Sequence, residues 1–350
     1  MVSRLRWAVV GAGWVARDHM VPALRASERS EVTLVVDRDL AAAGRLAAML
    51  PGAAAAGDVS ALAGAGLDAV YVATPNDAHL PVVAAAAAAG LPVLCEKPLA
   101  AELSDAERMV ELVEAAGVLA ATAYDQRWHP AHREVTRLVA DGALGTVTAV
   151  RIVYGCWLPP EWLPPGDTSG DNWRADPVRA GGGAYLDLAP HGLDLVGALL
   201  GEDVSTARTF LQRRVHDYSV DDGAVLVGST ASGVLVSLHV SYNTRDVLPR
   251  RRLEVVGTAG QLTAVDTMGQ TAGGALTFAD GGDGEQREIA FDVTLDPFTA
   301  QAAAFEDALL GSASWPFPIS RDLALLRLLH DAVDVPSTSS VPSARPEVHA

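Results

Sequence analysis

Lys97 is the only lysine among the 26 lysine and arginine residues of the chain, and it stands in a Glu96-Lys97-Pro98 stretch. A compact ammonium changes its pKa when it is partly buried, whereas a guanidinium stays protonated. A lysine can therefore hydrogen-bond a reacting oxygen and assist proton transfer where an arginine cannot. We predict that Lys97 is a catalytic residue that also contacts the substrate.

Asp187 and His191 stand four residues apart in the stretch from 181 to 194, where the sequence indicates a helix. Residues at this spacing share one helical face, so we expect Asp187 to orient the ring of His191 or to set its tautomer. His191 can then accept a hydroxyl proton as a general base. A surface ion pair or a metal site is the alternative; no third ligand has a suitable spacing, and we expect no metal.

A glycine-rich turn lies between an apolar run at 5–10 and a helical pattern at 17–26. In the dinucleotide fingerprint, the first glycine permits a tight turn, the second lets the pyrophosphate approach the backbone, and a small third residue allows close helix packing. The pyrophosphate sits at the helix N-terminus. The expected cofactor contacts in this turn are Gly11, Gly13, Trp14, Val15 and Ala16.

The next predicted strand, at 32–36, is followed by Asp37 and Arg38. The Asp37 carboxylate can accept hydrogen bonds from both ribose hydroxyls, and its charge repels a 2′-phosphate. Arg38 can instead pair with a phosphate, stack on adenine, or be a solvated loop charge. We expect NAD as the cofactor, with NADP as the alternative.

Further polar residues follow the predicted strands at 69–73 and 92–95. Ligands bind at the carboxyl edge of such sheets, so these loops should face the cofactor. His79 either contacts the cofactor or begins the following helix, and Glu96 either pairs with Lys97 or orients the nicotinamide. The expected contacts here are Thr74, Pro75, Asn76, His79, Glu96 and Lys97.

Strand and helix patterns alternate through the first third of the chain at the spacing of βαβ units. This alternation predicts a doubly wound parallel sheet of α/β class, a Rossmann domain over residues 1–123. The expected strands are 5–10, 32–36, 69–73, 92–95 and 118–123, and the expected helices are 17–26, 40–50, 79–89 and 105–116.

Closely spaced strands then predict an α+β domain over 124–335 with a large, mainly antiparallel open sheet. A Trp- and Pro-rich loop at 156–173 should contribute to binding or to an interface, and a Pro- and Ser-rich tail covers 336–350. The expected strands are 146–157, 204–212, 222–230, 233–242, 251–257 and 260–266, and the expected helices are 130–141, 184–200, 298–310 and 321–333.

Composition narrows the possible partners and location. The chain has 350 residues, of which 49% are hydrophobic, and a formal net charge of -17 with scattered basic residues. We therefore expect no nucleic acid and no membrane as partners. The start of the chain has no secretory pattern, which predicts a cytoplasmic protein. Two cysteines without a C-x-x-C pair favour neither a disulfide framework nor structural zinc.

Several stretches together resemble the glucose–fructose oxidoreductase, inositol dehydrogenase and rhizopine-catabolism family (Gfo/Idh/MocA) over roughly residues 5–335. Their order and spacing agree with that family, which makes the combination more specific than any one motif. The stretches are GAGWVARDH (11–19), VATPNDAH (72–79), EKP (96–98), QRWHP (126–130), GALG (142–145) and GGGAYLDLAPHGLD (181–194).

The resemblance implies an NAD(P)-dependent oxidoreductase that acts on CH–OH groups of a sugar, cyclitol or related polyol. It also implies a second domain for substrate binding and oligomerisation, whose open sheet often forms subunit interfaces, so we expect a homodimer or homotetramer. Lys97 matches the lysine of the family's EKP motif. Asp187 and His191 match its D-x-x-x-H pair, and Trp173 and Arg174 match a Trp-Arg element near cofactor and substrate.

The substrate contacts expected from this match are Lys97, Tyr124, Arg127, Trp173, Asp187 and His191. Two other activities stay open at this point. The first is an NAD-assisted lyase or hydrolase that acts on a sugar derivative and recycles its cofactor internally. The second is a nonenzymatic NAD-binding regulator.

Overall fold

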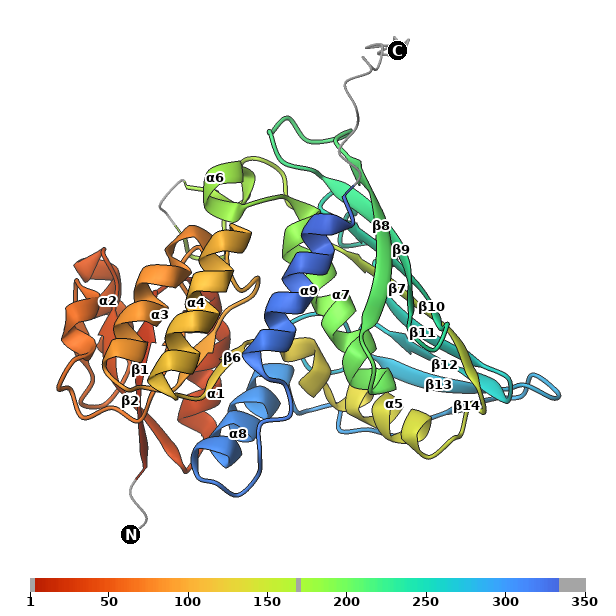
Figure 1. Cartoon of the computed structure of the whole chain (residues 1–350), viewed down its shortest axis with the longest axis horizontal. Helices are drawn as coiled ribbons and strands as arrows, with labels where there is room; N and C mark the ends of the chain where they lie inside the picture. The colour runs from red at the N-terminus through yellow and green to blue at the C-terminus, as the bar shows by residue number, and fades with distance from the viewer. Residues whose placement is uncertain (1–3, 168–170, 334–350) are drawn as a thin grey trace.

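The computed structural model describes residues 4–167 and 171–333, and its N-terminal part contains a six-stranded parallel sheet (Figure 1). The strand order is β3-β2-β1-β4-β5-β6, so the order reverses beside β1 as in doubly wound folds. The strands are β1 (Leu5–Val10), β2 (Ser30–Val36), β3 (Ala54–Ala56), β4 (Ala69–Val72), β5 (Val93–Cys95) and β6 (Ala120–Thr122).

Helices cover both faces of this sheet, which explains why its strands are apolar runs rather than alternating ones. In β1, Trp7 and Val9 pack with residues of α1 and α2, whereas Ala8 and Val10 pack with residues of α3 and α4. The doubly wound sheet predicted from the sequence is confirmed. The helices are a π-helical turn (Ala16–Met20), α1 (Val21–Ala26), α2 (Leu40–Ala47), α3 (His79–Ala88) and α4 (Leu103–Ala116), with short 3-10 turns at Val59–Leu62 and Asn76–Ala78.

The second sheet has eight strands in the order β14-β13-β12-β11-β7-β10-β9-β8. All neighbours are antiparallel except β7 and β10, so the expected mainly antiparallel sheet is also confirmed. The strands are β7 (Val147–Gly155), β8 (Val204–Gln212), β9 (Gly223–Thr230), β10 (Leu235–Ser241), β11 (Arg251–Gly257), β12 (Gly260–Val265), β13 (Ala275–Asp280) and β14 (Gln286–Glu288).

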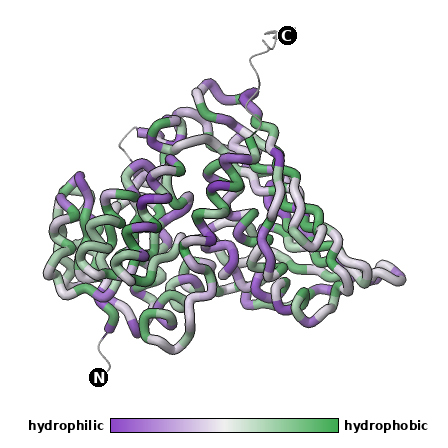
Figure 2. Tube along the Cα trace, viewed as in Figure 1, coloured by the Kyte–Doolittle hydropathy of each residue, from purple (hydrophilic) through white to green (hydrophobic). Residues whose placement is uncertain are grey.

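Strands β3, β13 and β14 were absent from the sequence prediction. β3 has three alanines and β14 has the three polar residues Gln-Arg-Glu, so neither has an apolar pattern that indicates a strand. The turn between β13 and β14 is hydrophilic at the far end of the molecule (Figure 2). β3 and β14 therefore form through pairing with their neighbours rather than through their own propensity.

Helix α7 (Ala184–Leu200) lies on the inner face of the second sheet, between the sheet and α9 (Figure 1). Most of its residues are buried, because the sheet covers one side of the helix and other helices cover the rest. The remaining helices are α5 (Pro130–Ala140), α6 (Pro177–Ala180), α8 (Pro297–Leu309) and α9 (Ile319–Asp331), with 3-10 turns at Asp125–Trp128 and Trp173–Ala175.

The last two helices return to the first sheet. Phe298 and Phe305 of α8 belong to the same core cluster as Trp7. In α9, Leu326 packs with the core on the other face of the first sheet, whereas Leu329 packs with the core of the second. The two sheets are thus joined by shared apolar packing. The predicted tail at 336–350 lies outside the described residues.

Candidate active site

A cleft of about 1340 Å³ lies between the carboxyl edge of the first sheet and the inner face of the second. Loops that follow β1, β2, β4 and β5 line one side, and residues of β7, α7 and β11 line the other. Fifteen of the predicted site residues line this cleft: Gly11, Gly13, Trp14, Val15, Asp37, Arg38, Thr74, Pro75, Asn76, Glu96, Lys97, Trp173, Arg174, Asp187 and His191.

The glycine-rich turn has the geometry of a dinucleotide cradle. Gly11 has a φ of 98°, and a Cβ there would lie 2.5 Å from the backbone of Ala73, so only glycine fits. A Cβ on Gly13 would meet no protein atom within 4 Å, so a glycine there leaves open space in the cleft lining. Ala16 is fully buried, packs in the core and does not line the cleft, so the expected direct cofactor contact of this residue is wrong and its small side chain serves helix packing. These residues fit a pyrophosphate that approaches the backbone at Gly13.

Asp37 directly follows β2 and holds the turn in place. One carboxylate oxygen accepts a hydrogen bond from the Ala12 N–H at 2.8 Å, and the other accepts from the Asp39 N–H at 2.8 Å. A carboxylate has about four acceptor positions, so two remain for ribose hydroxyls. Arg38 is exposed at the same end of the cleft.

His79 does not line the cleft and is the first residue of α3, so of the two alternatives for this residue the helix start is confirmed and the cofactor contact is wrong. Its ring is fully buried, with Nδ1 3.1 Å from the Leu99 carbonyl and Nε2 3.1 Å from the Thr74 carbonyl. The imidazole thus connects the loop after β4 with the loop after β5, and it does so from outside the cleft lining. Asn76 does line the cleft, and its side-chain amide donates to the Ala180 carbonyl at 2.8 Å.

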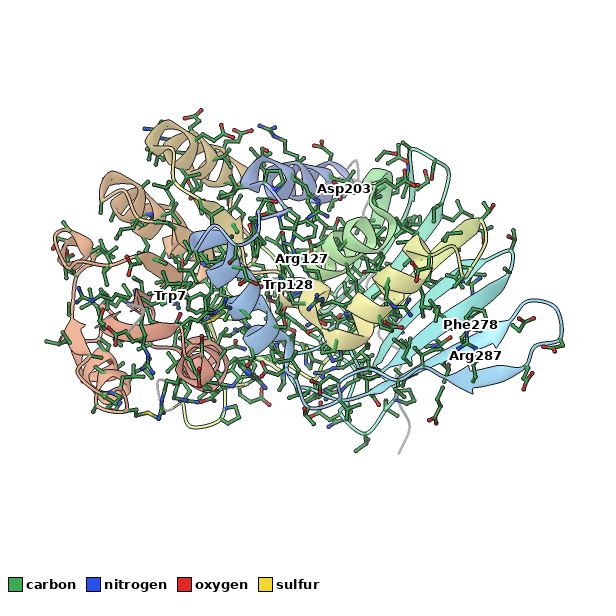
Figure 3. The ribbon with its side chains drawn as sticks, turned by 90° about the horizontal axis from the view of Figure 1, so that it is seen from below. Trp7, Arg127, Trp128, Asp203, Phe278 and Arg287 are labelled. Carbon is green, nitrogen blue, oxygen red and sulfur yellow. The ribbon has the colours of Figure 1, made fainter. Side chains whose placement is uncertain are left out.

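Tyr124 and Arg127 are buried as well, so the substrate contacts expected of them are wrong. Arg127 lies at the centre of the molecule (Figure 3), where it pairs with Asp194 at 3.1 Å and stacks 3.8 Å from the ring centroid of Phe317. The Tyr124 ring lies edge-on to His191, at 6.3 Å between ring centroids. Both residues support the site from outside the cleft, because neither belongs to its lining.

Lys97 directly follows β5, and its ammonium reaches across the cleft to Asp187 on α7. It donates to the backbone carbonyl of Asp187 at 3.0 Å and to the carboxylate atom Oδ1. The other carboxylate oxygen accepts a hydrogen bond from the Tyr242 hydroxyl at 2.7 Å. Burial alone would raise the pKa of Asp187, but Lys97 and Arg174 outweigh burial and hold this pKa below its usual range.

Glu96 does not pair with the Lys97 ammonium. Its Oε1 accepts a hydrogen bond from the Tyr71 hydroxyl at 2.5 Å, and its Oε2 accepts one from the Lys97 backbone N–H at 3.3 Å. Burial raises the pKa of Glu96. Because the residue also lines the cleft, it can hold a proton or a charge beside the Lys97 side chain.

His191 faces a different carboxylate from the one that the sequence suggested. Its Nδ1 lies 3.3 Å from Oδ1 of Asp125, and both side chains are 4% exposed. Asp187 shares the helix with His191, but its carboxylate is taken by Lys97 and Tyr242. The expectation that Asp187 orients the imidazole is therefore wrong, and Asp125 is the carboxylate that lies beside Nδ1, at ion-pair distance.

The Asp125 carboxylate is held by an amide of fixed orientation. Gln126 donates from Nε2 to Asp125 Oδ2 at 2.8 Å. The same amide donates to the Gly269 carbonyl at 2.8 Å, and its oxygen accepts from the Gly269 N–H at 2.9 Å. This pair of backbone hydrogen bonds determines which end of the Gln126 amide faces Asp125.

The pKa values of the buried acid and base shift in opposite directions. Burial lowers the pKa of His191 well below its usual value, and the nearby Lys97 ammonium lowers it further. Burial raises the pKa of Asp125 to about 8, and the charge of Glu96 adds to the rise. A neutral imidazole can accept a proton at neutral pH, which a protonated one cannot.

Trp173 and Arg174 lie in the 3-10 turn before α6. The Arg174 guanidinium lies 4.5 Å from the ring centroid of Trp173 and 5.5 Å from that of Trp162. Trp162 in turn contacts Trp14 of the glycine-rich turn edge-on, at 6.0 Å between ring centroids. The described part of the loop at 156–173 thus lies against the dinucleotide cradle and lines the cleft.

Asp125 and Tyr242 were missed in the sequence. Asp125 follows β6 at the same carboxyl edge as Asp37 and Lys97, and that position after a strand was the available signal. Tyr242 follows β10, which pairs with β9 and β7 in the middle of the second sheet, and no local pattern marks it.

The part of the chain that the structure describes has no group of three His, Cys, Asp or Glu side chains placed to hold a metal ion. Cys95 and Cys156 are free thiols. None of the described helices combines the length and apolar character needed to cross a membrane.

Two family models match the chain. One is described as an oxidoreductase family with an NAD-binding Rossmann fold and matches residues 5–124; the other is the GFO/IDH/MocA C-terminal domain and matches residues 132–263.

Relatives with assigned activities match most of the chain. The 1,5-anhydro-D-fructose reductase of Ensifer adhaerens is 30% identical over 310 residues, covering 87% of this chain and 88% of the relative. The dTDP-3,4-didehydro-2,6-dideoxy-alpha-D-glucose 3-reductase of Streptomyces antibioticus is 34% identical over 259 residues, covering 74% and 75%. The solved structure of KijD10, a 3-ketoreductase from Actinomadura kijaniata in complex with NADP and TDP-benzene, superposes with a TM-score of 0.78 at 26% identity, covering 95% of this chain and 97% of that chain.

Proposed function

The chain belongs to the GFO/IDH/MocA family of NAD-binding oxidoreductases, and on that premise we propose that it oxidises a secondary hydroxyl of a sugar, cyclitol or related polyol, or reduces the corresponding ketone. It is an NAD(P)-dependent oxidoreductase acting on CH–OH groups. The observation that carries the proposal is the meeting of Lys97, Asp187 and His191 in the cleft that also contains the glycine-rich turn.

The cofactor is held by the cradle at Gly11 and Gly13, by Asp37 at the adenosine end, and by the loops that carry Thr74 and Glu96. We propose a preference for NAD, since Asp37 can accept from ribose hydroxyls and repels a 2′-phosphate. A bound nicotinamide supplies the hydride acceptor for oxidation and the donor for reduction. The rest of the chemistry concerns the proton on the reacting oxygen.

His191 removes the hydroxyl proton in the oxidation direction. Its Nδ1 faces Asp125, so an ionised Asp125 keeps the proton on Nδ1 and leaves Nε2 free to accept the substrate proton. Lys97 donates a hydrogen bond to the reacting oxygen and stabilises the negative charge that develops there. Asp187 and Tyr242 position the ammonium rather than the imidazole.

A screen of polyols with NAD and NADP, and of ketoses with the reduced cofactors, tests the proposal in wild type and Lys97→Ala. We expect turnover with net NADH formation in the wild type and its loss in the variant, with cofactor binding retained. Equal turnover in the two proteins would contradict the role of Lys97. Product without net NADH would indicate a lyase or hydrolase, and cofactor binding without turnover would indicate a regulator.

We further propose that the chain forms a homodimer or homotetramer through the outer face of the second sheet. This face carries exposed apolar side chains on β8, β9 and β10, among them Phe210 at 65% and Leu235 at 64% exposure. Apolar patches of this kind mark association surfaces. A cytoplasmic location stays a prediction from the sequence.

A further inference from the structure

Arg251 begins β11 directly opposite Tyr154 of β7, so the two side chains share the inner face of the second sheet. Its guanidinium lies 5.9 Å from the ring centroid of Tyr154, and that ring lies 5.8 Å from the ring of His191. The Tyr154 ring therefore lies beside both Arg251 and the acid/base residue His191. Both Arg251 and Tyr154 line the cleft.

The Arg251 guanidinium has no carboxylate partner among residues 4–167 and 171–333, and its Nε is buried without a hydrogen-bond acceptor. Its neighbours in sequence are paired: Arg250 with Asp246, and Arg252 with Glu254. A buried donor without an acceptor costs free energy that a bound ligand would recover. The unpaired donor thus points to a ligand with acceptor oxygens.

A second guanidinium, that of Arg174, lies on the substrate side of the cleft, where its charge helps to lower the pKa of Asp187. Arg174 stacks on the rings of Trp173 and Trp162, and no ion pair involves it within the described part of the chain. The chain has a net charge of -17, yet both Arg174 and Arg251 line the cleft without an ion pair in the described part of the chain. A guanidinium without a carboxylate partner can form charge-assisted hydrogen bonds to an anionic group of a ligand.

We propose that Arg251 binds a carboxylate or phosphate group of the substrate, which makes the substrate class sugar acids or sugar phosphates rather than neutral polyols. The inference rests on the proposed function. The anionic group that Arg251 binds belongs to the same substrate molecule whose hydroxyl gives its proton to His191. Nε and one terminal nitrogen of a guanidinium can bind two oxygens of such a group side by side. In this proposal the sugar ring lies beside Tyr154 and connects the anionic group to the reacting carbon.

We call the anion-binding position at Arg251 the subsite. Calorimetry on the NAD-loaded full chain measures ligand binding to the subsite without requiring turnover. The ligands are D-glucose, D-glucuronate and D-glucose 6-phosphate, which share a ring and differ in charge. We expect one or both anions to bind at least about tenfold more tightly than glucose, as a charge-assisted hydrogen bond implies. Arg251→Gln should abolish this difference. Arg252→Gln removes an equal charge from the exposed, opposite face of β11 and should preserve it.

Equal binding of the charged and neutral sugars, or anion binding that survives Arg251→Gln, overturns the subsite. Preference for glucuronate over the phosphate, or the reverse, identifies the group. Turnover of matched neutral and anionic polyols is measured separately. Turnover of neutral polyols without Arg251-dependent anion binding leaves the oxidoreductase proposal standing and rejects the subsite. Arg251-dependent binding without turnover of any of them supports the subsite and counts against the proposed reaction.

Discussion

The ammonium of Lys97 donates to both the backbone carbonyl and the carboxylate of Asp187, a residue 90 positions further along the chain and on the other side of the cleft. The Lys97 and Asp187 side chains are 15% and 20% exposed. Because both side chains are mostly buried, removal of either the ammonium or the carboxylate would leave the other charge poorly solvated. The pair therefore determines where the only ammonium side chain of the protein lies relative to His191.

Lys97→Arg should reduce kcat as severely as Lys97→Ala, although it keeps the positive charge. A guanidinium is larger and stays protonated, so it cannot reproduce a single donor at the reacting oxygen. We expect a fall of roughly 10²-fold or more for loss of a donor that stabilises the transition state. Steady-state kinetics at saturating cofactor measure it, and wild-type kcat in Lys97→Arg would contradict the assigned role.

The rate of oxidation should rise with pH up to about 8. Burial, with a contribution from Glu96, raises the pKa of Asp125 from 3.8 to about 8. Below that pH Asp125 is protonated and can place its proton against Nδ1 of His191, which leaves Nε2 without a free lone pair. A profile of kcat/KM against pH checks this expectation, and a profile without an inflection near 8 would contradict it.

The free energy of unfolding should also depend on the ionisation of Asp125. It should fall as pH rises, whereas the rate of oxidation should increase. The native state keeps a proton on Asp125 that the unfolded chain releases near its ordinary pKa of 3.8. Its contribution to the free energy of unfolding is therefore complete below 3.8, falls between 3.8 and about 8, and is constant above that. Denaturant unfolding measures the free energy of unfolding of wild type and Asp125→Asn at several pH values in this range. The contribution of Asp125 is the difference between the two proteins in how this free energy changes with pH.

Asp125→Asn should also abolish most of the activity, because the orientation of Gln126 is fixed. Its Nε2 faces residue 125, so an asparagine must turn its oxygen toward Gln126 and its NH2 toward His191. The imidazole then carries its proton on Nε2 and cannot act as a base there. We expect kcat to fall by about 10²- to 10⁴-fold, the usual contribution of a general base. Asp283→Asn, in the exposed β13–β14 turn, serves as the control and should be fully active.

The two glycines of the cradle should respond differently to alanine. Gly11→Ala places a Cβ 2.5 Å from the Ala73 backbone at a φ of 98°, and we expect a loss of about 2–4 kcal/mol of stability. Gly13→Ala meets no protein atom, so stability should be unchanged while the dissociation constant for NAD rises about tenfold or more. Thermal unfolding with and without NAD separates the two effects; a destabilised but normally binding Gly13→Ala would contradict the cradle.

The sequence was informative where the signal was local. Alternating strands and helices indicated the first sheet, and glycine spacing indicated the cradle. The partner of His191 could not be predicted in this way. Asp187 and His191 share a helix face as expected, but a carboxylate pairs more strongly with an ammonium than with a neutral imidazole, and Lys97 arrives from another part of the chain.

Arg127 illustrates a second kind of failure. A charged side chain in a motif suggests a ligand contact, because charged residues are seldom buried. Here Asp194 and the ring of Phe317 create a buried position for the guanidinium. Both partners come from later in the chain, so no local pattern could reveal the position.

The packing of α8 on the first sheet has a consequence for biosynthesis. Trp7 contacts Phe305 at 5.8 Å between ring centroids, and Ser30 donates to Glu306, 276 residues later, at 2.6 Å. Chains fold largely from the N-terminus as they leave the ribosome. The part of this face that α8 covers is therefore exposed when the first sheet emerges, and it is closed only after almost the entire chain has been translated.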